Sequence, residues 1–86
     1  MPTISEFHGI VIRMFNNHHA PPHPHATYGE FEGVVGLDPT AILAGRLPSR
    51  VEKMVAEWVE LHRQELLANW ERGQRLEALQ RIDPLP

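Results

Sequence analysis

The sequence predicts an α+β domain in which a small antiparallel β-meander of three to four strands is covered by one long C-terminal helix. Short runs rich in β-branched and apolar residues, separated by Gly and Pro turn signals, make residues 1–47 β-rich. Residues 51–71 contain neither Gly nor Pro, and their apolar side chains recur at helical spacing. Because the chain has 86 residues, we expect it to form a single domain, 1–86.

The first predicted strand is Gly9–Phe15, with the sequence GIVIRMF. A loop rich in His and Pro follows over residues 16–25, because the prolines at 21, 22 and 24 fit neither a central strand nor a helix. The third of these, Pro24, lacks the N–H that a strand ladder requires. We therefore expect strand pairing to resume at His25.

A β-hairpin is predicted after this loop, from His25–Tyr28 and Phe31–Leu37. The two-residue link Gly29-Glu30 suits a type II′ turn, whose first position needs a positive φ. In that register Tyr28 faces Phe31, Thr27 faces Glu32 and His25 faces Val34. A short last strand is expected over Ala41–Ala44.

The helix is predicted over residues 49–72, followed by a tail, 73–86. Ser49 and Glu52 have the spacing of a capping box, and Gly73 is placed to end the helix. One face carries an apolar stripe, and Trp70 lies about 120° around the helix from Trp58. Because little of the domain is expected on that side, Trp70 is predicted to contact a partner. The stripe consists of Val51, Met54, Val55, Trp58, Val59, His62 and Leu66.

Composition narrows the classes of function. The absence of cysteine excludes disulfides, thiolate metal sites and cysteine nucleophiles. The formal net charge of −3, with scattered basic residues, makes nucleic acid an unlikely ligand. No apolar run approaches the roughly 20 residues of a membrane span, and the N-terminus lacks a signal-peptide core. We expect no membrane association and a cytoplasmic location.

A cluster of histidines is the strongest candidate site. His23 and His25 are two residues apart, so in an extended segment both rings project from one face, about 7 Å apart. Imidazole is a preferred ligand of zinc, nickel and copper. Residue His19 precedes them across a stiff turn, and Glu32 shares their face in the predicted hairpin. The predicted site for a divalent transition metal is therefore His19, His23, His25 and Glu32.

Three further residues are candidates for the same site: His18, Glu30 and His62. His62 lies in the apolar stripe of the helix, whereas the hairpin register points His23 and His25 away from the helix. Either the loop curls over the sheet edge towards His62, or the two sets are separate. The alternative interpretation is that the loop histidines are only solvated and that His62 is a core residue bonded to a backbone carbonyl or to a side chain of another strand.

Four segments resemble a small bacterial family, domain of unknown function 4160: PTISEFHGIVIRMF, HHAPPHPHATYGE, LAGRLPSR and EWVELHRQELLANWE. The family loop is similar to D-H-x-P-P-H-F-H-A, so its histidines fall on His19, His23 and His25. His18 stands where the family has Asp, and Pro24 where it has an aromatic residue. The resemblance implies a gene neighbour that encodes a second small domain, in a pair of toxin–antitoxin type, and no established activity.

These observations predict a partner-binding component of a two-gene, toxin–antitoxin-like module that carries a histidine cluster for a divalent transition metal. The partner is the product of the neighbouring gene, a second copy of the chain, or both. The alternative function is a small histidine-dependent or metal-dependent hydrolase, for example a nuclease. Whether the chain is an enzyme is left open, since no familiar catalytic motif is present.

Overall fold

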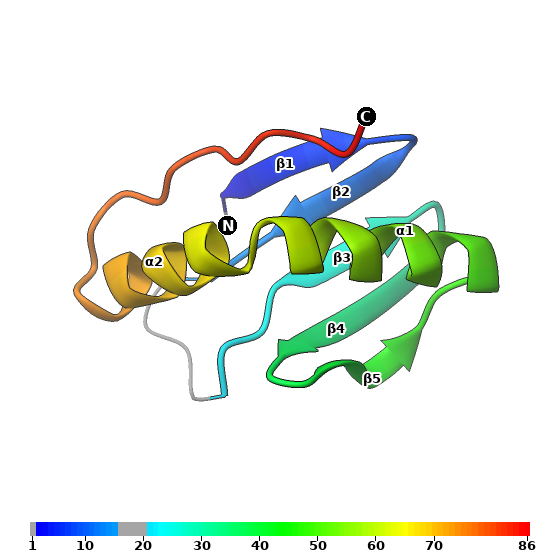
Figure 1. Cartoon of the computed structure of the whole chain (residues 1–86), viewed down its shortest axis with the longest axis horizontal. Coiled ribbons are helices and arrows are strands. Elements are labelled where there is room, and N and C mark those ends of the chain that lie inside the picture. The colour runs from blue at the N-terminus through cyan, green and yellow to red at the C-terminus, as the bar shows by residue number, and fades with distance from the viewer. Residues whose placement is uncertain (1, 16–20) are drawn as a thin grey trace.

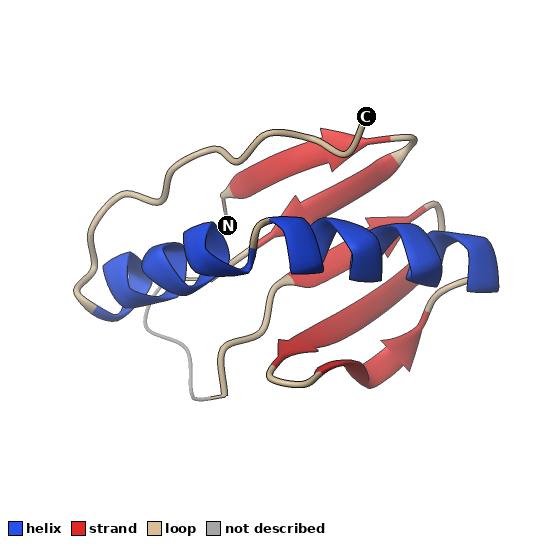
Figure 2. Ribbon diagram, in the orientation of Figure 1, coloured by secondary structure: helices blue, strands red, loops and turns tan. Residues whose placement is uncertain are grey.

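In a computed structural model, which describes residues 2–15 and 21–86, a five-stranded antiparallel sheet carries two consecutive helices on one face (Figures 1 and 2). The strands follow one another in the sheet in chain order, as a meander. The prediction of three to four strands under one long helix is therefore wrong. The elements are β1 (Thr3–Phe7), β2 (Ile10–Arg13), β3 (His25–Tyr28), β4 (Phe31–Leu37), β5 (Thr40–Arg46), α1 (Ser49–Leu61) and α2 (Arg63–Gln74).

Strand β1 is the element that the sequence did not predict. It pairs with β2 through a two-residue link, His8-Gly9, with Phe7 opposite Ile10. Both link residues have positive φ, 51° for His8 and 80° for Gly9. A two-residue hairpin link of type I′ requires positive φ at both positions. His seldom adopts positive φ, so only Gly9 of the two link residues indicated a turn in the sequence.

The β3–β4 hairpin has the predicted register. Tyr28 pairs with Phe31, and His25 with Val34. Gly29 has φ 58°, as the first position of a type II′ turn requires. Strand β3 begins at His25, directly after Pro24, whose carbonyl still accepts a hydrogen bond of 2.9 Å from the Val35 N–H.

The helical segment is interrupted at His62, which corrects the prediction of one continuous helix. This residue has φ −118° and ψ 23°, outside the helical region. The His62 carbonyl nevertheless accepts a hydrogen bond of 2.9 Å from the Leu66 N–H, so a backbone hydrogen bond still joins His62 to the first turn of α2. Because neither Gly nor Pro marks the interruption, residue type gave no warning. The ring of His62 instead packs on that of Trp58, with centroids 5.5 Å apart.

Both ends of the helical segment differ from the prediction. Pro48 is the N-cap of α1, Ser49 is already helical, and no side chain caps this end, so the capping box does not form. At the other end Gly73 is buried inside α2. The chain reverses at Leu76, which adopts φ 59°.

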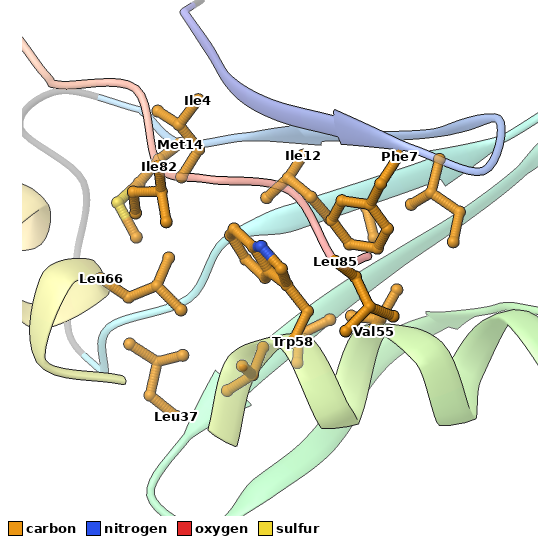
Figure 3. Close-up of a cluster of buried hydrophobic side chains, with 14 of the residues drawn as sticks. Ile4, Phe7, Ile12, Met14, Leu37, Val55, Trp58, Leu66, Ile82 and Leu85 are labelled. Carbon is orange, nitrogen blue, oxygen red and sulfur yellow. The ribbon is translucent and has the colours of Figure 1, made fainter. Parts of the chain in front are cut away.

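The core lies between the sheet and the helices, with the fully buried Trp58 at its centre (Figure 3). Alternate residues of the hairpin reach it: Ala26, Val35 and Leu37 are buried, while Tyr28 and Phe31 pack against them, as their alternation predicts. The indole N–H of Trp58 donates to the Asp83 carbonyl at 2.8 Å. The C-terminal tail, which after the end of α2 comprises residues 77–86, therefore completes the core.

The tail runs parallel to β1 along the outer edge of the sheet (Figure 1). Three contacts share one sequence offset of 78 residues: Arg81 Nη1 to Thr3 O, Ile82 N to Ile4 O, and His8 Nε2 to Pro86 O. Ile82 and Leu85 are 5% and 8% exposed. These contacts close the β1 edge with a segment that is not itself a strand.

Candidate histidine site

The first residue of the site, His25, opens β3 and lies between Arg13 of β2 and Val34 of β4. Its neighbour Ala26 is buried under the helices, so His25 projects from the opposite face of the sheet. Glu32, opposite Thr27, projects from the same face. The Nδ1 atom of His25 lies 3.5 Å from the Glu32 carboxylate. The predicted placement of this pair on one face is confirmed.

Four aromatic rings form a row at the end of the sheet where β3 begins. Trp70 contacts His23, His23 contacts His25, and His25 contacts Phe15, with centroid distances of 5.1, 5.5 and 4.6 Å. His23 therefore packs on a residue of α2. Trp70 is only 5% exposed, so the prediction that it contacts a partner is wrong. His23 packs on its ring, a contact that the sequence did not reveal.

The Nδ1 atom of His23 lies 2.6 Å from the carbonyl oxygen of Pro21. A carbonyl only accepts, so Nδ1 carries the proton and donates it. In the neutral ring the lone pair is then on Nε2. Metal-ligating histidines commonly donate their second ring nitrogen in this way, which fixes the tautomer and the ring orientation.

The remaining predicted residues are not gathered at this pair. Glu30 is exposed in the β3–β4 turn, at the other end of β3 from His23. His62 lies against Trp58, and its Nδ1 is 2.5 Å from Glu65 Oε1. His18 and His19 fall outside the described residues. Within residues 2–15 and 21–86, no three His, Asp or Glu side chains are grouped so as to hold a metal ion.

Sequence reasoning missed two contributors to the site, Phe15 and Pro21. Phe15 was assigned only to a strand, yet two-residue alternation from Arg13, which pairs with His25, places it on the same face as that histidine. The role of Pro21 is its backbone carbonyl, which no residue-type pattern reveals.

An apolar cavity of about 140 Å³ lies beside the same loop. One of its lining residues, Leu43 of β5, is 50% exposed. Its lining comes from the loop, the end of β4, the β4–β5 turn and the start of β5: Pro21, Pro22, Gly36, Leu37, Asp38, Pro39, Ala41 and Leu43.

The fold and the site define a small α+β domain with a histidine pair at one end of its sheet. Residues 9–71 match the profile of a family described as domain of unknown function (DUF4160), and the chain belongs to that family. This confirms the resemblance found in the sequence. Comparisons with curated proteins and with solved structures each gave no match. Among the described helices, none is long and apolar enough to span a bilayer.

Proposed function

We propose that this chain is a partner-binding component of a two-gene, toxin–antitoxin-like module, and that its histidine cluster binds a divalent transition metal. Two observations support the metal site. The rings of His23 and His25 are brought to a centroid separation of 5.5 Å, and the Pro21 carbonyl holds His23 in the tautomer with its lone pair on Nε2.

The ring separation suits two ligands of one ion. With metal–nitrogen distances of about 2.0–2.1 Å and tetrahedral angles, the centroids of two imidazoles on one zinc ion lie roughly 5 Å apart. The side chain of His25 is 15% exposed, so the pair is partly withdrawn from water. Zinc, nickel and copper all accept imidazole nitrogen, so the proposed ion is one of these three.

The proposed ligand set is His23, His25 and His19. Glu32 was predicted as a fourth ligand; its carboxylate lies 3.5 Å from Nδ1 of His25, and in this proposal it supports that ring from outside the ligand set. His19 is included in the ligand set because of its position in the sequence, four residues before His23. Its neighbour His18 offers a further imidazole.

Partner binding is supported by the two edges of the sheet. The β1 edge is covered by the tail, whereas β5 is the last strand and four of its residues from Leu43 onward are exposed. Unpaired edge N–H and C=O groups accept an added strand. The cavity beside Leu43 would accept an apolar side chain from such a strand. The family resemblance points to the product of a neighbouring gene as the partner.

The metal site is tested by elemental mass spectrometry on untagged protein, with light scattering in line for mass. We expect about one transition-metal ion per protein chain. Replacing His19, His23 and His25 by Ala should abolish this metal content. The matched control is His8→Asn, which removes an imidazole from the β1–β2 turn and keeps a residue that tolerates positive φ. Unchanged metal content in the triple variant, or no uptake of zinc, nickel or copper by the native chain, would contradict the site.

Partner binding is tested by co-expression with the neighbouring gene. We expect the two products to co-purify, and Leu43→Asp to weaken the complex at least tenfold, because it places a charge at the apolar cavity. The control is Leu61→Asp, on a residue that is 62% exposed on α1. A chain that stays alone in the presence of the neighbour's product would reject this part of the proposal and leave the metal result unaffected.

A further inference from the structure

We infer that the tail, residues 77–86, exchanges between two copies of the chain, so that the tail of each copy lies along β1 of the other. The interaction surface is formed by the residues of β1, α1 and α2 that the tail contacts in the single chain. The occupant is the same segment of a second copy. This inference does not depend on the proposed metal site or on the partner from a neighbouring gene.

The tail is held by a small set of contacts to the body of the domain. Asn69 of α2 pairs with both backbone groups of Gln80, at 2.8 and 2.9 Å. The Trp58 indole donates to the Asp83 carbonyl, and the Ile82 N–H donates to the Ile4 carbonyl, both at 2.8 Å. All of these contacts join the tail to residues outside it. A tail from a second copy would therefore make every one of them unchanged.

Two buried side chains of the tail pack into the core of the domain. Ile82 and Leu85 are 5% and 8% exposed and belong to the core cluster around Trp58 (Figure 3). Because a second copy carries the same two residues at the same spacing, its tail matches this surface in shape and polarity. No other partner is shown by the structure to have this match.

The hinge for the exchange lies at Leu76. This residue is 68% exposed and has φ 59°, a left-handed conformation that disfavours side chains other than Gly. The reversal is closed by two hydrogen bonds, from Leu76 N to Gly73 O and from Glu77 N to Arg72 O, and by the Arg75–Glu77 ion pair. Opening the hinge releases Leu76 in both copies and keeps all core contacts, which is the condition for exchange of an identical element.

The hinge itself provides the first test. Leu76→Pro fixes φ near −65° and removes the N–H that bonds Gly73, so the closed reversal cannot form. We expect this variant to have twice the monomer mass by light scattering at a concentration where Leu76→Gly, which accepts φ 59° without strain, is a monomer. A folded Leu76→Pro monomer would overturn the inference.

A second measurement keeps the native hinge and decides the question if Leu76→Pro does not fold. Because the chain has no cysteine, Thr3→Cys and Arg81→Cys can be made in separate copies, at positions in contact in the structure. After joint refolding at high concentration with a chelator present, oxidation should give the mixed cross-linked dimer. Thr3→Cys mixed with Glu57→Cys, on the exposed face of α1, is the control. A yield no higher than in the control would overturn the inference.

Discussion

Asn69 is the polar residue on which the tail most depends. It is fully buried, at 0% exposure, and its side-chain amide pairs with the N–H and the C=O of Gln80. Its Oδ1 atom also accepts a hydrogen bond of 2.9 Å from Arg72. The amide thus satisfies both backbone hydrogen-bonding groups of one tail residue, as a neighbouring strand would. A buried polar side chain in the helix is explained by this pairing.

We expect Asn69→Ala to destabilise the domain by about 2–4 kcal/mol, since each buried group left without a partner costs about 1–3 kcal/mol. Urea unfolding followed by Trp fluorescence measures the change. The matched control is Gln80→Ala, which removes an exposed side chain and keeps its backbone pairing, with an expected effect within about 0.5 kcal/mol. Equal effects of the two substitutions would show that the pairing contributes nothing.

At the histidine site, what the sequence could predict was local. His25 and Glu32 were placed on one face because strand alternation and a two-residue link fix the register. The contact of His23 with Trp70 could not be predicted in the same way. It joins a loop to the far end of the helical segment, and such a contact depends on the path of the chain between them.

Among the elements, β5 and the helical segment are tied together by a polar network. Thr40 at the start of β5 donates to the Glu60 carboxylate at 2.6 Å, and Arg63 of α2 reaches both residues, at 2.7 and 2.6 Å. The Thr40 hydroxyl and the Arg63 guanidinium together lower the pKa of Glu60. The network thus bridges the interruption at His62.

Acid should weaken this network. A carboxyl whose pKa is lowered by folding contributes stability above its unfolded pKa, about 4.3, and that stability is lost as the pH falls through the folded pKa. We therefore expect Glu60→Gln to be less stable than the native chain at pH 7, with a smaller difference at pH 3. Urea midpoints across this range measure it. Glu57→Gln, an exposed site on the same helix, should show no such convergence.

Local turn chemistry explains which elements were predictable. The β3–β4 hairpin was predicted with its register because Gly29 occupies the position that needs positive φ. Strand β1 was missed because His8 adopts φ 51° in the β1–β2 link, where His gives no such signal. The interruption at His62 was missed for a related reason: the residue leaves the helical region although it is neither Gly nor Pro.

In the whole molecule, the two edge strands of the sheet differ in whether another segment covers them. The β1 edge is covered by a tail whose Pro84 and Pro86 lack the N–H needed for a ladder, so the cover does not offer a new complete edge. The β5 edge has no such cover among the described residues. The sheet is thus protected from growth on one side and open on the other, which is the side that the proposed partner would use.

The constant offset of 78 residues between the tail and β1 also sets a time order. At about 5–20 residues per second of synthesis, the segment that covers β1 leaves the ribosome roughly 4–16 s after the strand it covers. During that interval the nascent chain presents a bare strand edge and an unfinished core. A newly made chain on a neighbouring ribosome could supply its own tail at that moment, so translation from closely spaced ribosomes would favour pairing of sister chains.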